Sequence, residues 1–112
     1  GKIVAAPYDS DELLVFDPMK ETVKGVKIGR VAYGKGKFRG ICAVGKKAFA
    51  APCHSDELLI YDSTTDEVRG VDITSIARGG WKYADICVVD GKVVASPCHA
   101  DKILIYDPVL DE

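Results

Sequence analysis

The stretch PCHSDELLIYD, residues 52–62, decides the fold because the chain contains three versions of it. It occurs as PYDSDELLVFD at residues 7–17 and as PCHADKILIYD at residues 97–107, so successive copies are 45 residues apart. Residues outside this stretch share the offset without insertion or deletion, among them Gly25 and Gly70, Phe38 and Tyr83, Ile41 and Ile86, and Cys42 and Cys87. A fixed period along the whole chain indicates a tandem array, here of about 2.5 units.

Each unit contains four short runs that favour β-strands over helices. In the complete unit these runs are residues 41–44, 48–51, 58–61 and 68–73. Gly45 provides a turn after the first run, and Pro52, which cannot donate to a ladder, ends the second. The first three runs are nearly continuous in apolar residues, whereas the fourth alternates. This pattern predicts a sheet that is covered on both faces, with the fourth run as its outer edge.

A four-stranded unit of this length resembles a blade of a β-propeller, in which WD repeats have about 40–45 residues and kelch repeats about 50. The resemblance covers the whole chain and is kelch-like in architecture. Gly79-Gly80 before Trp81 is similar to the kelch glycine doublet, whereas the Gly-His and Trp-Asp signatures of WD repeats are absent. The resemblance implies an all-β fold of four-stranded antiparallel blades in an incomplete ring. A β-solenoid remains the alternative fold.

The phase of the repeat divides the chain into three parts of one domain. We expect an incomplete blade at about residues 1–33, a full blade at about 38–78 and an incomplete blade at about 83–112. With strands a to d numbered outward from the centre, the chain runs b-c-d, a-b-c-d, a-b-c. Closed propellers have about four to eight blades, so one chain cannot close a ring. A fragment of a longer propeller is the simpler interpretation, and an oligomer of incomplete blades is the alternative.

Composition excludes several classes of function. The net charge of −2 provides no basic field for nucleic acid or anionic lipid. No apolar run is long enough to span a bilayer, so we expect a soluble protein. Four cysteines in this arrangement do not form the pattern of a secreted disulfide scaffold, which favours a reducing compartment such as the cytoplasm. Cys42 and Cys87 lie within apolar runs and are expected to act as small hydrophobic residues.

Two kinds of loop are predicted to meet at one rim of the propeller. They are the loops between strands b and c of each blade and the loops that connect strand d of one blade to strand a of the next. Side chains in loops on the shared face of a repeat array are not needed to pack the core, so we expect ligands to bind there. Trp81 is the strongest candidate for a ligand contact. The other copy has Gly36 at this position, so the fold does not require a tryptophan there. Phe38 and Tyr83, just before the first strands, are expected to pack between blades. The predicted ligand-binding residues are Asp11, His54, Asp56, Trp81, Lys82, His99 and Asp101.

The recurring aspartates Asp11, Asp56 and Asp101 allow two interpretations. They could form a ring of acceptors for a sugar, a cation or a basic peptide. More often, such residues accept backbone N–H bonds within their own turn, and we favour that interpretation. It applies still more strongly to the second set of aspartates, on the opposite rim, which comprises Asp17, Asp62 and Asp107.

Two Cys-His pairs, Cys53-His54 and Cys98-His99, suggest a metal site. Adjacent residues of an extended chain point to opposite sides, so the two cannot readily bind one ion together. The spacing is not that of a zinc knuckle or ribbon, and the first unit has Tyr8 and Asp9 instead. We therefore predict no metal and no cofactor.

No paired catalytic carboxylates, nucleophile elbow or phosphate-binding loop is present. The sequence therefore favours a non-catalytic interaction module that binds a protein or peptide partner. A carbohydrate-binding propeller is the first alternative. The second is part of a propeller enzyme, an oxidase or hydrolase, whose catalytic residues lie outside this segment.

Overall fold

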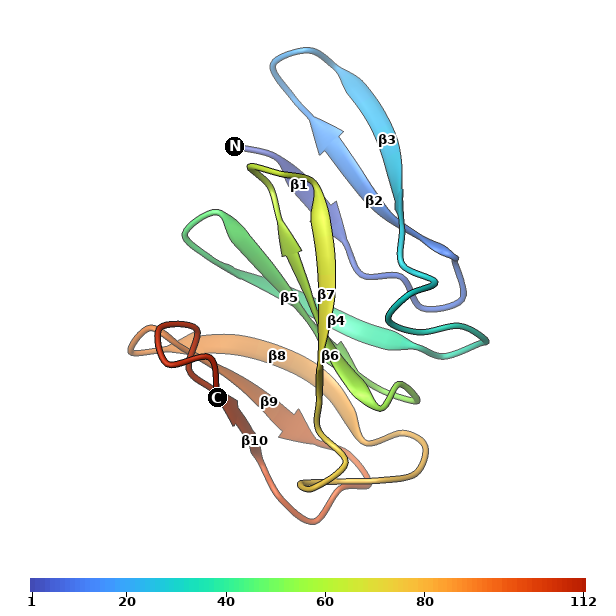
Figure 1. Ribbon diagram of the computed structural model, residues 1–112, viewed down its shortest axis with the longest axis vertical. Coiled ribbons are helices and arrows are strands. Elements are labelled where there is room, and N and C mark those ends of the chain that lie inside the picture. The colour runs from blue at the N-terminus through green and yellow to red at the C-terminus, as the bar shows by residue number, and fades with distance from the viewer.

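The computed structural model describes all 112 residues, which form three antiparallel sheets (Figure 1). Sheet 1 contains β1 (Ile3–Ala5), β2 (Glu12–Asp17) and β3 (Thr22–Lys27). Sheet 2 contains β4 (Phe38–Val44), β5 (Lys47–Pro52), β6 (Glu57–Asp62) and β7 (Glu67–Asp72). Sheet 3 contains β8 (Tyr83–Val89), β9 (Lys92–Pro97) and β10 (Leu104–Tyr106). The chain is thus all-β, and it contains no helix long and apolar enough to cross a membrane.

The order of strands follows the predicted phase of the repeat. Sheet 2 has the order β4-β5-β6-β7, with the alternating strand at its edge, and sheets 1 and 3 have three strands each. The turn at Gly45, where φ is +61°, sets the register of the first hairpin and pairs Cys42 with Phe49 as expected. The first strands begin three residues earlier than predicted, at Phe38 and Tyr83, because the chain pairs on through a β-bulge.

The sheets pack face to face and follow one another along the molecule (Figure 1). Sheet 2 is covered on both sides, as its continuous apolar strands predicted. The residues buried between sheets 1 and 2 are Leu13, Val15, Ile28, Phe38, Ala48, Ala50, Leu59 and Tyr61. Those buried between sheets 2 and 3 include Phe49, Leu58, Ile60, Ile73, Tyr83, Val93, Ala95, Leu104 and Tyr106. The two interiors match at an offset of 45 residues, so both junctions use one packing arrangement.

The first strands of neighbouring sheets converge along one side of the stack. β4 lies against β8, and a Cβ atom added to Gly40 would be 3.2 Å from the Cα atom of Asp85. Glycine at this position therefore lets the two backbones approach closely. The three sheets form an open stack and no closed ring.

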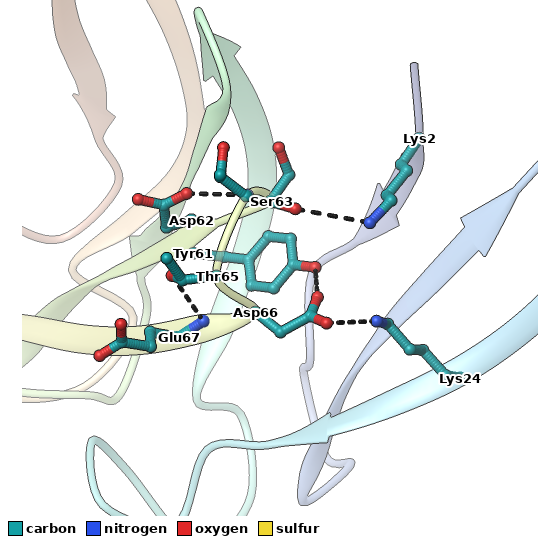
Figure 2. A network of polar contacts seen from close by, with 9 residues as sticks. Lys2, Lys24, Tyr61, Asp62, Ser63, Thr65, Asp66 and Glu67 are labelled. Carbon is teal, nitrogen blue, oxygen red and sulfur yellow. Dashed lines mark hydrogen bonds and ion pairs between the residues drawn. The ribbon is translucent and has the colours of Figure 1, made fainter.

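A polar clamp joins the outer parts of adjacent sheets (Figure 2). The Tyr61 hydroxyl, on β6, donates a hydrogen bond to Asp66 in the following turn, and Lys24 on β3 of sheet 1 pairs with the same carboxylate at 2.5 Å. The clamp recurs at the next junction, where the Tyr106 hydroxyl donates to Asp111 and Arg69 pairs with that carboxylate at 2.9 Å. Each clamp thus ties the turn of one sheet to the outer strand of the sheet before it.

The clamp lowers the pKa of its two carboxyl groups. For Asp66 the main cause is the hydrogen bond from Lys24, followed by that from Tyr61. For Asp111 the hydrogen bond from Tyr106 comes first and that from Arg69 second. A carboxylate with a lowered pKa in the folded state stabilises the fold above its unfolded pKa of about 3.9, and this stabilisation is lost as the pH falls through the folded value.

The double variant Asp66→Asn, Asp111→Asn should therefore unfold more easily than the unchanged chain at neutral pH. Its free energy of unfolding should also fall less when the pH is lowered through the carboxyl range. Urea unfolding followed by circular dichroism at a series of pH values measures both effects. Asp101→Asn is the matched control, since it removes an exposed carboxylate that makes no hydrogen bond. An unchanged pH dependence in the double variant would contradict the assignment.

Candidate functional site

The loops between the second and third strands meet the loops that connect neighbouring sheets, as the rim hypothesis expected. Lys37 forms the first meeting point: its backbone N–H donates to the carbonyl of Tyr8 at 2.7 Å, and its own carbonyl accepts from Cys53 at 2.9 Å. Lys82 repeats this arrangement, with Cys53 as its acceptor at 3.0 Å and Cys98 as its donor at 2.8 Å. These bonds fix the relative positions of consecutive loops and form a continuous rim.

The side chains of Lys37 and Lys82 are buried beneath this rim. The Lys82 ammonium group donates to the carbonyl of Gly79 at 2.6 Å, and Lys37 does the same with Gly34 at 2.5 Å. Burial lowers the pKa of Lys82, although the nearby Asp56 and Cys53 partly oppose that effect. Lys82 was expected to contact a ligand, but the structure places it below the surface, where it holds the loop that carries Trp81.

Trp81 lies on the surface of the rim, and its backbone is held at both ends. Its N–H donates to Nδ1 of His54 at 3.4 Å, and its carbonyl accepts from the backbone N–H of His99 at 2.9 Å. The indole ring and the His54 ring form a T-shaped pair with 4.8 Å between centroids, and the indole ring lies 6.4 Å from the ring of Tyr8. Yet the residue remains 41% exposed, so it forms a fixed aromatic surface.

The backbone of Trp81 adopts a conformation that favours glycine. Its φ is +54°, and its equivalent in the previous unit, Gly36, has a φ of +63°. A side chain in this region costs of the order of 1 kcal/mol or more, and such strain is concentrated at functional sites. The other copy has glycine at this position and the same backbone conformation, so the fold does not require a tryptophan here. The strained and exposed tryptophan therefore marks the rim as a candidate binding site.

His54 supports Trp81 from a narrow slot. The backbone of Gly36 lies on one side of the imidazole ring and that of Gly80 on the other, and a Cβ atom at either glycine would lie within 3 Å of the ring. Because Nδ1 accepts the bond from Trp81, the proton of the neutral ring lies on Nε2. Beyond Tyr8, the guanidinium carbon of Arg39 lies 6.0 Å from the centre of the tyrosine ring, which extends the row of planar groups.

The structure corrects the interpretation of the rim aspartates. The carboxylates of Asp11, Asp56 and Asp101 are exposed and form no hydrogen bonds within the chain, so they do not stabilise the turns as expected. The hydroxyls of Ser10 and Ser55 do so instead, each accepting from a backbone N–H two residues later at 3.0 Å. The opposite set follows the prediction: Asp17, Asp62 and Asp107 each accept a backbone N–H two residues later.

The remaining predicted residues are distributed along the rim. His54 and Trp81 are in contact, whereas His99 is exposed on the next loop. Cys53 is buried, which raises the pKa of its thiol, and Cys98 is exposed. The structure brings together no group of three or more His, Cys, Asp or Glu side chains that could hold a metal ion. All four cysteines have free thiols.

Two residues of the site, Tyr8 and Arg39, were missed by the sequence analysis. In the first unit Tyr8 occupies the position that Cys53 and Cys98 have in the other two. That departure from the repeat is the same kind of signal that identified Trp81.

A scan of known family models and a search of curated proteins found no match to this sequence.

The strain at Trp81 can be measured by comparing two variants. Trp81→Gly relieves the strain of the positive φ, because glycine adopts this conformation freely. Trp81→Ala keeps the strain, and both variants remove the same aromatic contacts. In ordinary strands and helices alanine is more stabilising than glycine, but here the order should reverse, with the glycine variant more stable by about 1 kcal/mol. Urea unfolding provides this comparison. A more stable alanine variant would show that the backbone at this position is not strained.

Proposed function

We propose that the three sheets are blades of a β-propeller that serves as a non-catalytic interaction module. The complete four-stranded sheet, the 45-residue period and the convergence of the first strands support this architecture. The repeated packing of each sheet on the next supports it further. Propellers perform many functions, so the proposed function rests on the rim and not on the architecture.

The binding surface comprises the Trp81 platform, which we define as Trp81, Tyr8, His54 and Arg39. Tryptophan, tyrosine and arginine are the residue types that contribute most to binding at protein interfaces. The backbone of Trp81 is fixed before any partner arrives, which reduces the entropy lost on binding. The observation that carries the proposal is the exposed tryptophan kept at a position where glycine would relieve strain.

The partner that fits this surface is a peptide segment with apolar and basic side chains. The aromatic rings provide faces for apolar groups and for cations. Exposed carboxylates that form no bond within the chain, Asp11, Asp56 and Asp101, are available to basic side chains along the same rim. Such a segment would bind as an extended chain along the row of loops.

A displayed library of random peptides, selected on the 112-residue chain, tests this function. Bound peptides should be rich in lysine or arginine beside an apolar residue. Trp81→Gly should weaken their affinity at least about tenfold, because it removes a central aromatic contact of the kind that costs 2 kcal/mol or more. Met19→Ala is the matched control, since Met19 is an exposed apolar residue on the opposite rim.

Equal binding by the unchanged chain and by Trp81→Gly would contradict the proposal, because the platform would not be the site. A glycan array screened with the same two proteins distinguishes the alternative function. Glycan binding that is lost in Trp81→Gly, together with a failed peptide selection, would favour a carbohydrate-binding propeller.

A further inference from the structure

A groove opens between sheets 1 and 2 at the rim opposite the Trp81 platform. Its volume is about 520 Å³, which is within the range of small-molecule sites. β1 and the β2–β3 turn form one wall, and the β4–β5 hairpin and the β6–β7 turn form the other. The apolar and hydroxyl side chains that line it include Val4, Met19, Ala43, Ala48, Ser63 and Thr64.

The repeat gives a reason for the hollow, because these positions have equivalents 45 residues later at the junction of sheets 2 and 3. Three of the apolar positions carry smaller side chains at the first junction. At the second junction the ring of Phe49 packs on that of Tyr106, with 5.8 Å between centroids. The pairs, first junction before second, are Val4 and Phe49, Ala43 and Val88, and Ala48 and Val93.

The same comparison shows that the first junction has gained polar and basic groups. Its turns carry two hydroxyl groups and an ammonium group where the second junction has none. The Ser63 hydroxyl donates to the carbonyl of Lys46 at 2.8 Å, and Thr64 is exposed. The pairs are Lys46 and Gly91, Ser63 and Pro108, and Thr64 and Val109.

A narrower hollow continues the groove towards the polar clamp and carries further positive charge. Its volume is about 100 Å³, and it shares Lys2 and Asp17 with the groove. An equivalent hollow is present at the second junction, but its charges differ. The differing residues are Lys20 and Thr22 at the first junction and Thr65 and Glu67 at the second.

Three ammonium groups around this groove have no carboxylate partner. They belong to Lys2, Lys20 and Lys46, and neither of the two ion pairs in the chain involves them. Lys2 Nζ reaches across to the carbonyl of Ser63 at 3.4 Å (Figure 2). The carboxylate of Asp17 accepts backbone N–H groups of its own turn. The groove is therefore locally positive in a chain whose net charge is −2.

We propose that this groove binds a small phosphate ester with an apolar body. The body lies on the apolar side chains, and the phosphate lies between Lys2 and Lys46, with the hydroxyl of Thr64 as a further donor. Lysine binds phosphate as a point charge, and a phosphate carries more negative charge than a carboxylate. This site is separate from the Trp81 platform and does not depend on the function proposed for it.

Titration of the 112-residue chain with phenyl phosphate, followed by its amide signals in nuclear magnetic resonance spectra, tests this site. The signals that shift should be those of residues 2–4, 17–20, 43–48 and 61–64, around the groove. Phenol lacks the phosphate and inorganic phosphate lacks the ring, so each should bind at least about tenfold more weakly. The residue-resolved shifts also distinguish the groove from apolar surface elsewhere on the chain.

Two variants exchange residues of the groove for those of the second junction. Val4→Phe introduces the ring that Phe49 supplies there, and it should abolish the shifts. Lys46→Gly removes one ammonium group at a position where the next unit has glycine, and it should weaken binding about threefold or more. Lys35→Gly removes the same charge from the opposite rim and should leave binding unchanged. Circular dichroism verifies that each variant is folded.

Three results would overturn the proposal. Millimolar phenyl phosphate that shifts no signal, or only signals outside the groove, would show that the site does not bind it. Equal binding by the unchanged chain and by Lys46→Gly would contradict the placement of the phosphate, and this variant decides the matter if Val4→Phe does not fold. Phenol that binds in the groove as tightly as phenyl phosphate would show that the ammonium groups select no anion.

Discussion

Each sheet of this protein is apolar on both faces, and this constraint determines the rest of the structure. In sheet 2, Phe49 and Ile60 point to one side and Ala48 and Tyr61 to the other, because successive residues of a strand alternate between faces. Burying such a sheet requires a neighbour on each side. The 45-residue repeat provides those neighbours, and it places the same residue types opposite one another at both junctions.

Polar contacts fix how each sheet is positioned on the sheet before it. The clamps at Asp66 and Asp111 join each sheet to the one before it at one end of the strands. The backbone bonds of Lys37 and Lys82 join the loops at the other end. Because both kinds of contact run from one unit to the next, they fix the register of the stack. The loop that carries Trp81 is held by the second kind, so the rim depends on the packing of the sheets beneath it.

The fold was more accessible from the sequence than the site. Short apolar runs, turn residues and a fixed period indicated the strands, their order and the pairing of Cys42 with Phe49, because these features are local or repeat along the chain. The clamp was missed, although its residues recur at the same offset. Lys24 and Asp66 are 42 residues apart and come together only when two sheets pack.

Predictions for the rim failed where either of two neighbouring side chains could make the same hydrogen bond. Turn chemistry at Ser55-Asp56 could be supplied by a hydroxyl or a carboxylate, and the structure uses the hydroxyl. The burial of Lys82 could not be read from a charged residue in a predicted loop. Trp81 stood out because it replaces glycine, and the positive φ supplies the physical reason.

Hydrogen exchange resolved by residue tests the central claim, that a sheet here is stable because neighbours cover both of its faces. The amides of β5 and β6, in the middle of the covered sheet, should exchange only through global unfolding and be the slowest in the chain. Those of β2 and β9, the central strands of sheets that are covered on one face only, should exchange faster. Equal rates in β5, β6, β2 and β9 would contradict the account.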